Sequence, residues 1–362
     1  MSLVLDGISL GVPGASVLED VSVQFERGSL NVLLGPTLSG KTSMMRVMAG
    51  LDRPDRGRVL MDGADVTGVP VRRRSVAMVY QQFVNYPTLS VYENIASPLR
   101  VAGLPRAEIE ARVQDAARLL RLAPLLRRTP AQLSGGQQQR TAIARALVKR
   151  AALVLLDEPL ANLDYKLREE LREELPALFA RTGAILVYAT TEPMEALLLG
   201  GCTTTLWEGR VTASGPAAAT YRNPPNLPAA RVFSDPPLNE LLVEAQGGQL
   251  RLSDGQALPG LPGLPDGSWR LGFRAEHLQV GRPPPGSLGL AGRVNVTEIA
   301  GSESYVHVDV GVATWVALLR GVTDLPPGEA VQVHVDPRCI MAFGTDGRRA
   351  VLAQPAPSRV VA

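Results

Sequence analysis

Cysteine is scarce in this 362-residue chain, which contains only Cys202 and Cys339. The two lie far apart and match no metal-binding spacing, so the simplest interpretation is a pair of structural thiols in a reducing compartment. A run of apolar residues long enough to span a bilayer is also missing, as is a signal peptide after Met1. We therefore expect a soluble protein, for which any role at a membrane comes through a partner.

An excess of charge of either sign is missing too. The chain has 37 basic and 35 acidic residues, which leaves a net charge of +2. This balance gives no argument for binding nucleic acid or an anionic membrane surface. The histidines His277, His307 and His334 stand at scattered spacings, and we do not expect them to form a metal site.

The most informative stretch that is present, Gly35–Ser43, fits the phosphate-loop pattern G-x-x-x-x-G-K-[ST]. We expect a short buried strand, Asn31–Leu34, before the loop and a helix after it that ends at Gly50. In that setting Lys41 reaches the β- and γ-phosphates of a nucleotide, and the Thr42 hydroxyl binds Mg²⁺. An ordinary glycine-rich turn is the alternative. The residues expected to bind ATP here are Gly35, Pro36, Thr37, Leu38, Ser39, Gly40, Lys41, Thr42 and Ser43.

Two acidic residues, Asp157 and Glu158, follow the fully apolar strand Ala152–Leu156. Nucleotide hydrolysis needs a Mg²⁺ site and a group that activates or positions water. Asp157 is the candidate for holding Mg²⁺, and Glu158 is the candidate general base. Gln81 ends a second strand, Val76–Tyr80, and its amide can bridge Mg²⁺ and the water. The alternative, that two acids merely cap a buried strand, is disfavoured by the phosphate loop in the same chain.

The order of elements predicts an α/β protein with two domains, because apolar strands alternate with helices before the composition changes near residue 214. A helix over Tyr165–Arg181 is expected to be interrupted by Pro176. Six prolines between Pro216 and Pro237 suggest a linker or an extended segment. Short β patterns beyond it predict a small barrel or sandwich. We expect domains over 1–232 and 233–362, with a helical subdomain near 83–150.

A second motif lies between the phosphate loop and the two acids, and its Ser and Gln have the spacing of a helix-opening capping box. Together with Gln81 and the turn Ala161–Asp164, these motifs occur in the order typical of ABC-type ATPases, which the chain resembles. The motif residues are Leu133, Ser134, Gly135, Gly136 and Gln137.

That resemblance implies a dimer in which each ATP is held between the phosphate loop of one subunit and the signature motif of the other. Ser134 and Gly136 would then serve the partner's nucleotide, and Asp164 would stand in the dimer-facing turn. ATP, with Mg²⁺, would complete the interface, and hydrolysis would let the subunits part.

The β-rich tail resembles the accessory domain of the carbohydrate-importer branch, in particular at Gly272–His277 and Gly301–Tyr305. The implied fold is a P-loop ABC-type ATPase core with a helical subdomain, followed by a small all-β, OB-like domain. In this branch two transmembrane permease subunits would dock near Phe83–Pro87, and a periplasmic solute-binding protein would act indirectly. The implied location is the cytoplasmic face of a bacterial inner membrane, with no nucleic acid as a partner.

Two positions depart from the family pattern. The family reads Thr-His-Asp-Gln-x-Glu-Ala after the last core strand, and Thr191 stands at the histidine position. A hydroxyl can donate to the γ-phosphate, but it lacks the reach and the charge of an imidazole. The family also places an aromatic ring on adenine, where this chain has Val12 or Pro13. Both departures affect the chain's own half of the site, which favours a weak site and pairing with a second, different ATPase subunit.

The amino-acid sequences of the motifs around Gly35, Tyr80 and Tyr188 resemble those of the ATP-binding subunits of proteobacterial glycerol importers. The expected function is therefore ATP hydrolysis that energises import of glycerol or a related polyol. Two alternatives stay open: a homodimeric ATPase for sugars or glycerol phosphates, and a weakly hydrolysing regulatory subunit. A soluble P-loop kinase is disfavoured because it would lack the motif Leu133–Gln137.

Overall fold

The computed structural model describes residues 2–82, 84–161, 163–180 and 183–352. The chain divides into two compact units, residues 1–220 and 221–362, which are described separately. The sequence places the boundary after residue 232, whereas the division falls after Thr220. Helix α8 (Leu227–Val232) explains the difference, because Leu227 and Ala230 pack with Phe343 in the core of the second unit.

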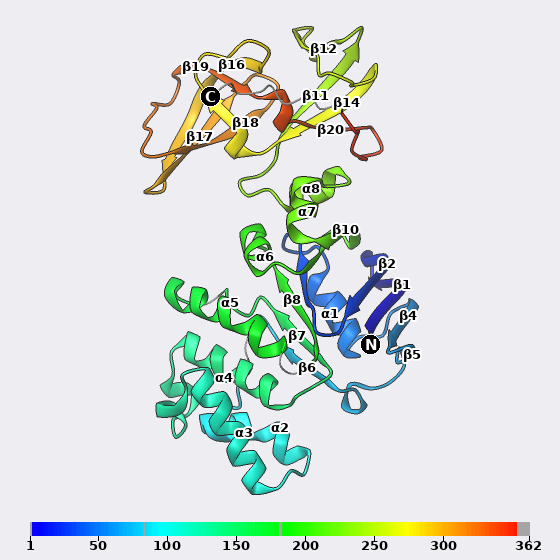
Figure 1. Cartoon of the computed structure of the whole chain (residues 1–362), viewed down its shortest axis with the longest axis vertical. Helices are drawn as coiled ribbons and strands as arrows, with labels where there is room; N and C mark the ends of the chain where they lie inside the picture. Colours follow the sequence, from blue (N-terminus) through cyan, green and yellow to red (C-terminus); the bar gives the residue numbers. More distant parts are fainter. Residues whose placement is uncertain (1, 83, 162, 181–182, 353–362) are drawn as a thin grey trace, which may run out of the picture. The chain divides into compact units, whose positions relative to one another are not determined.

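A six-stranded sheet in the order β10-β9-β3-β8-β7-β6 forms the centre of the first unit (Figure 1). Neighbours from β9 to β6 run parallel, and only β10 pairs antiparallel, with β9. The inner strands β7 and β8 are buried along their whole length, as expected for a parallel sheet covered on both faces. The strands are β3 (Leu30–Leu34), β6 (Val76–Val79), β7 (Leu153–Asp157), β8 (Ile185–Thr190), β9 (Cys202–Trp207) and β10 (Arg210–Pro216).

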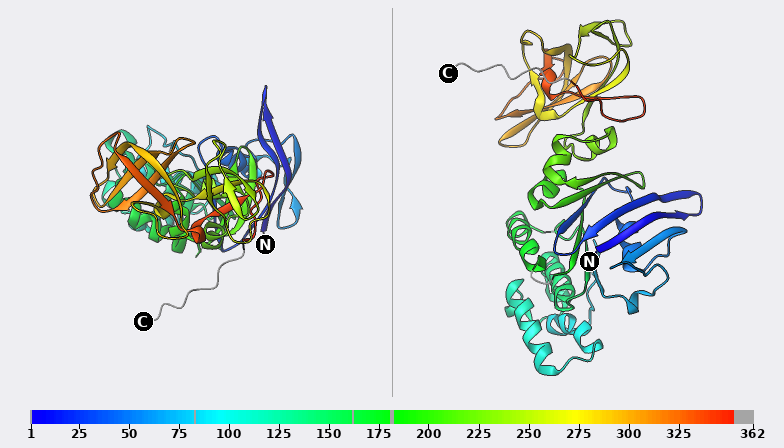
Figure 2. Two further views of the ribbon diagram at one scale, coloured as in Figure 1. Left: turned by 90° about the horizontal axis from the view of Figure 1, so that it is seen from above. Right: turned by 45° about the vertical axis from the view of Figure 1, so that its right-hand side comes forward.

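A second, antiparallel sheet in the order β2-β1-β4-β5 packs over helix α1 (Lys41–Ala49). Its first two strands form a long hairpin, drawn in dark blue at the right of Figure 2. The buried methionines Met44, Met45 and Met48 fill the space between the two sheets. The strands are β1 (Ser2–Val12), β2 (Ala15–Glu26), β4 (Arg56–Met61) and β5 (Ala64–Asp65).

Three helices form the helical part of the first unit: α2 (Val91–Val101), α3 (Arg106–Leu119) and α4 (Gly135–Val148). They share one apolar core with α5 (Tyr165–Ala180). The predicted interruption at Pro176 is wrong, since α5 continues through that residue. Leu171 and Leu175 are buried before the proline, and this packing holds the helix together despite the hydrogen bond that proline cannot donate.

Beyond α8 the second unit is built on β-strands, as predicted, which form two five-stranded sheets, β13-β12-β11-β14-β20 and β15-β19-β16-β17-β18. The buried Asn239 joins them, because its side chain bonds both the N–H and the C=O of Val316 at 2.8 and 2.9 Å. The strands are β11 (Asn239–Gln246), β12 (Gln249–Arg251), β13 (Ala257–Pro259), β14 (Gly267–Phe273), β15 (Leu278–Val280), β16 (Leu288–Ile299), β17 (Glu303–Asp309), β18 (Thr314–Arg320), β19 (Ala330–Val335) and β20 (Met341–Phe343).

The proline-rich stretch is not the extended segment that its composition suggests. It contains two short helices, α7 (Ala217–Arg222) and α8. The Asn226 side chain caps α8 by accepting from the N–H of Ala229 at 2.9 Å, and Pro228 lies in the first turn. Proline fits there because the first-turn N–H groups have no partner within a helix.

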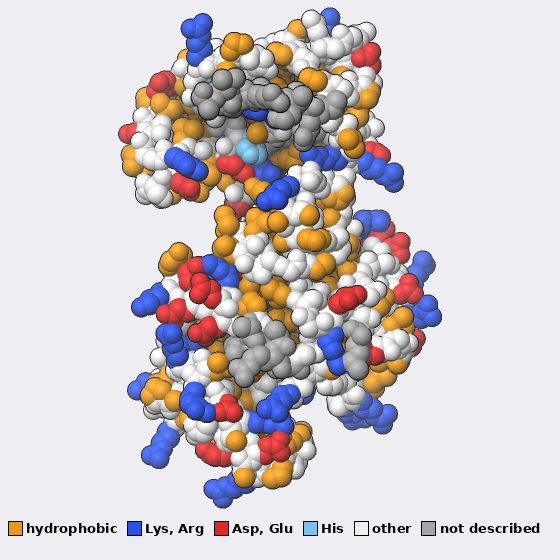
Figure 3. Space-filling view, viewed as in Figure 1, with side chains coloured by type: hydrophobic (Ala, Val, Ile, Leu, Met, Phe, Trp, Pro, Cys, Tyr) orange, Lys and Arg blue, Asp and Glu red, His pale blue; other side chains and the backbone are white. Residues whose placement is uncertain are grey.

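No helix in the described ranges is long and apolar enough to cross a membrane. Basic and acidic side chains are mixed over the helical part of the first unit (Figure 3). This distribution agrees with the near-zero net charge of the sequence.

Candidate active site

The phosphate loop, the two acids and Gln81 all follow strands of the central sheet. Strands β3, β8, β7 and β6 are parallel and adjacent, so their carboxyl ends meet at one edge. Gly35 follows β3, Thr191 follows β8, Glu158 follows β7, and Gln81 comes shortly after β6. The sheet order therefore gathers residues from four distant parts of the sequence.

The phosphate loop folds around the side chain of Lys41. The buried ammonium donates to the carbonyls of Gly35 at 2.7 Å and Pro36 at 3.0 Å. Gly40 has a φ of 103°, which glycine adopts readily, and it directly precedes α1. A Cβ at Gly35 would come within 2.5 Å of the Leu206 carbonyl. These contacts set the loop at the N-terminus of a helix, where free N–H groups attract anions.

The Thr42 hydroxyl donates to the Asp157 carboxylate at 2.8 Å. Asp157 is buried, and this burial raises the pKa of its carboxyl, although the bond from Thr42 opposes the shift. A hydroxyl and a carboxylate oxygen are ligands that Mg²⁺ accepts, usually beside waters and phosphate oxygens. The donor set around Asp157 and Thr42 therefore fits this ion.

Glu158 faces Gln81 and Lys41. The Gln81 amide donates to its carboxylate at 2.9 Å, and the Lys41 ammonium lies 3.9 Å away. Partial burial raises the pKa of Glu158, against the attraction of Lys41. Its φ of 45° is uncommon outside glycine and turns the chain sharply at the end of β7. This places a basic carboxylate beside the phosphate loop.

Thr191 stands directly after β8, at the same edge, and is half-buried. The glutamate of the same motif, to which the sequence alone assigns no role, bonds the end of β8. Glu195, in helix α6 (Pro193–Leu199), is buried and accepts from the hydroxyls of Tyr188 and Thr190. Its place at the glutamate of the motif Thr-His-Asp-Gln-x-Glu-Ala was the available signal, but nothing in the sequence showed which way it faces.

The signature motif opens helix α4 as predicted. Ser134 is the N-cap, and the Gln137 N–H and side chain complete a capping box with bonds of 3.4 and 3.1 Å. The helix start is tied to the rest of the site by two amides. Asn85 donates to the Gln138 carbonyl at 2.9 Å, and the buried Gln139 donates to the Pro159 carbonyl. Gln139 thereby connects α4 to the turn after Glu158, a link that the sequence did not indicate.

The turn that contains Asp164 leads into helix α5, since the Asp164 carbonyl accepts from the Arg168 N–H at 2.9 Å. The Arg168 side chain donates to the Ala161 carbonyl and to Glu192, both at 3.1 Å. Glu192 directly precedes α6. The turn and the segment that carries Thr191 are thus joined. Asn162 and Phe83, which belong to two of the predicted segments, lie outside the described residues.

The expected adenine platform falls at the tip of the β1–β2 hairpin. Val12 pairs with Ala15 there and is 54% exposed. The turn consists of Pro13 and Gly14, and the Gly11 N–H donates to Asp55 at 2.7 Å. The tip therefore offers an exposed aliphatic side chain and a proline where the family pattern places an aromatic ring.

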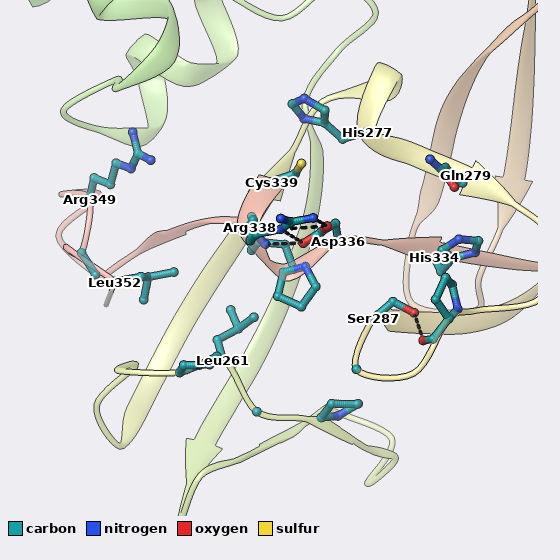
Figure 4. A pocket seen from close by; sticks show the side chains of 18 of the residues that line it. Leu261, His277, Gln279, Ser287, His334, Asp336, Arg338, Cys339, Arg349 and Leu352 are labelled. Carbon is teal, nitrogen blue, oxygen red and sulfur yellow. Dashed lines mark hydrogen bonds and ion pairs between the residues drawn. The ribbon is translucent and has the colours of Figure 1, made fainter. Parts of the chain in front are cut away.

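A separate cavity of about 1050 Å³ lies within the second unit (Figure 4). It is lined partly by prolines and contains Glu276, His334 and Asp336. Both carboxylates have partners: Arg338 bonds Asp336 at 3.0 Å, and the Tyr221 hydroxyl bonds Glu276 at 2.8 Å. The catalytic candidates all belong to the first unit.

Comparison with known proteins decides the family. The sequence matches the ABC transporter family over residues 18–161 and the TOBE domain family over residues 271–343. It is 35% identical to the sn-glycerol-3-phosphate import ATP-binding protein UgpC of Paracoccus denitrificans, over 96% of this chain and 98% of that protein. The trehalose/maltose import ATP-binding protein MalK of Thermococcus litoralis is also 35% identical, over 93% and 95% of the two chains.

The chain belongs to the ATP-binding proteins of ABC transporters. A solved ATP-binding subunit of an ABC transporter matches 61% of this chain and 92% of its own, with a TM-score of 0.56 and 29% identity. The ATP-binding cassette MJ0796, solved as a dimer with ADP and Pi, matches 59% and 98% with a TM-score of 0.55 and 28% identity. This ABC ATPase binds ATP and couples its hydrolysis to transport by membrane permeases. The predicted fold class is confirmed in both units.

Proposed function

We propose that this ABC ATPase energises the import of glycerol or a related polyol, and that it works beside a second, different ATPase subunit. The observation that carries the catalytic part is the meeting of Lys41, Asp157 and Glu158 at one edge of the sheet. Relatives named for import of sn-glycerol-3-phosphate and of trehalose or maltose support a small hydroxylated substrate. Sugars and glycerol phosphates remain the competing substrates.

The proposed chemistry divides among a few side chains. The Lys41 ammonium exchanges a loop carbonyl for the β- and γ-phosphate oxygens of ATP. Thr42 and Asp157 would hold Mg²⁺, with Gln81 as a further ligand, and the ion would offset the negative charge of the phosphates. The Glu158 carboxylate accepts the proton of the attacking water, a role helped by a pKa raised toward the working pH. Thr191 donates a hydrogen bond to the γ-phosphate.

The proposed dimer places the signature of each subunit on the other's ATP. The capped start of α4 aims the N–H groups of Gly135 and Gly136 at the γ-phosphate across the interface, where a helix N-terminus favours an anion. Asp164 stands in the dimer-facing turn. Thr191 and the hairpin without an aromatic ring weaken only this chain's own half of the dimer. Pairing with a second subunit that has a histidine and an aromatic ring would give one fast site, at that subunit's phosphate loop, and one slow site, at the phosphate loop of this chain.

The proposed docking surface for two transmembrane permease subunits is the segment 84–87. Val84 is 59% and Tyr86 48% exposed. The segment is held from behind, since Asn94 bonds both the N–H and the C=O of Tyr86, and the Arg145 guanidinium lies 5.1 Å from the Tyr86 ring centre. Rigid exposed apolar side chains suit a cytoplasmic helix of a permease. This docking would hold the chain at the cytoplasmic face of the inner membrane, with a periplasmic solute-binding protein acting on the far side.

Reconstitution into proteoliposomes tests the substrate. The chain is purified through a tag with the permease subunits and any second ATPase, and solute-binding protein is added with glycerol, glycerol 3-phosphate or trehalose. We expect glycerol to stimulate ATP hydrolysis severalfold and the other two to leave it near the basal rate. Stimulation by glycerol 3-phosphate or trehalose alone would assign the chain to that substrate instead. The subunit count of the purified complex decides between a hetero- and a homodimer.

The alternative of a weakly hydrolysing regulatory subunit has one supporting feature, the cavity in the second unit. It predicts that a complex in which the second ATPase subunit carries the equivalent of Glu158→Gln shows no substrate-stimulated hydrolysis, whereas the proposed slow site would leave a residual rate. The matched control adds Glu158→Gln in this chain, which should remove that residual rate.

A further inference from the structure

Glu195 is a buried acid beside the catalytic edge, and none of the steps proposed above gives this residue a role. Its side chain accepts from the Tyr188 hydroxyl at 2.6 Å with one oxygen and from the Thr190 hydroxyl with the other. Tyr188 is itself buried. The Thr190 hydroxyl also accepts from the Glu192 N–H at 3.0 Å. One carboxylate from α6 thus clamps two residues of β8.

The end of β8 forms backbone hydrogen bonds with the chain segments that lie on either side of it at the catalytic edge. The Thr190 carbonyl accepts from the N–H of Gly35, the first residue of the phosphate loop, at 3.4 Å. The Ala189 carbonyl accepts from the N–H of Glu158 at 3.0 Å. The first bond lies one residue beyond the last pair of β3 with β8, and the second lies one residue beyond the last pair of β7 with β8. They would open if the end of β8 were free to move.

We propose that Glu195 is a positioning residue for ATP hydrolysis, which fixes the end of β8 and through it the backbone of Gly35 and Glu158. Thr191 follows immediately and is fixed by the same contacts. The inference rests on the roles proposed above for these residues. Displacement of a reacting group by about 1 Å can cost a hundredfold in rate, so a clamp at this place acts on turnover more than on binding.

Burial raises the pKa of the Glu195 carboxyl, and the hydrogen bonds from Thr190 and Tyr188 oppose that shift. Burial of a carboxyl costs free energy unless hydrogen bonds satisfy its oxygens, and both oxygens of Glu195 accept such a bond. A glutamine of the same shape has one oxygen that accepts a hydrogen bond from one hydroxyl. Its NH2 group donates to the other hydroxyl once that hydroxyl rotates. Glutamine keeps the connection to both hydroxyls, whereas alanine removes it.

Hydrogen exchange followed by mass spectrometry on the full-length chain tests the clamp without relying on hydrolysis. In Glu195→Ala we expect the amides of Gly35 and Glu158 to exchange at least tenfold faster, and peptides from the β1–β2 hairpin to remain unchanged. Glu195→Gln restores most of the protection. The matched control is Glu192→Gln, an exposed acid three residues earlier, which leaves both amides as in the wild type. Unchanged exchange at Gly35 and Glu158 in Glu195→Ala would overturn the proposal.

Kinetics of an assembled transporter in which the second ATPase subunit carries the equivalent of Glu158→Gln supply the second readout, because the remaining hydrolysis comes from this chain's own site. We expect kcat for ATP in Glu195→Ala to fall at least tenfold while the KM changes less than threefold, and Glu195→Gln to recover most of the kcat. A purely structural role would instead lower the yield of folded chain and leave kcat per folded complex unaltered. If exchange responds and kcat does not, the clamp exists but has no effect on hydrolysis, which overturns the positioning role.

Discussion

The hydroxyl of Thr42 and the carboxylate of Asp157 are 2.8 Å apart although 115 positions separate them in the sequence. Thr42 lies in the first turn of α1, after β3, and Asp157 ends β7. The intervening strand β8 brings the ends of both strands to one edge. This single contact sets the two ligands proposed for Mg²⁺ beside the ammonium that would meet the phosphates.

In the purified chain without a second ATPase subunit, substitution of Glu158 by glutamine is expected to abolish hydrolysis and preserve ATP binding. The amide keeps the shape of the side chain but cannot accept the proton of the attacking water. We expect kcat to fall at least about a hundredfold, in the range that removal of general base catalysis costs, with the Kd for ATP within about threefold. Phosphate release and filter binding measure the two quantities. Brisk turnover by this variant would exclude Glu158 as the base.

Replacement of Thr191 by histidine is expected to raise the turnover of this chain's own site. An imidazole reaches farther than the threonine hydroxyl and can carry charge to the γ-phosphate. An increase in kcat of about tenfold corresponds to about 1.4 kcal/mol of additional transition-state stabilisation. Thr191→Ala is the matched control and should lower the rate or leave it unchanged. An equal response to alanine and histidine would show that position 191 does not contact the nucleotide.

Introduction of an aromatic ring at the hairpin tip is expected to strengthen ATP binding. Val12 is exposed and lies where the family resemblance predicts the adenine base. Stacking of a base on an aromatic ring is worth about 1–3 kcal/mol, so Val12→Tyr should lower the Kd for ATP about five- to a hundredfold. Titration calorimetry with ATP gives the value, and inorganic triphosphate, which has no base, serves as the control ligand. A gain shared by triphosphate would contradict stacking.

The buried carboxyl of Asp157 gives a pH-dependent stability. Burial raises the pKa of Asp157 in the folded chain above that in the unfolded chain. The folded state then binds more protons, so this group favours folding at low pH and loses that contribution as pH rises through its folded-state pKa. Without nucleotide or Mg²⁺, Asp157→Asn should raise Tm near neutral pH by about 2–4 °C, the shift expected for about 1 kcal/mol in a unit of this size.

The same comparison at acidic pH provides the control for that prediction. Below the folded-state pKa of Asp157 the wild-type carboxyl is protonated, and the difference in Tm should shrink toward zero. Scanning calorimetry across the pH range measures it. A difference that is independent of pH would mean that the substitution acts through packing rather than through the charge.

The sequence alone determined the local motifs and the family. The loop Gly35–Ser43 and the capping box at Ser134 are short-range patterns, in which neighbouring residues fix the backbone and its hydrogen bonds. The alternation of buried strands and helices likewise depends on local periodicity. These features could therefore be predicted, and the structure and the relatives agree with them.

Only the tertiary structure decided how the motifs are connected. The order of strands places β8 between β3 and β7, and no local pattern encodes that order. The clamp of Glu195 on Tyr188 and Thr190, the bond from Gln139 to Pro159 and the unbroken helix through Pro176 all depend on which faces pack together. Burial selects these contacts because a desolvated polar group must find a partner, and the partner is known only once the chain has folded.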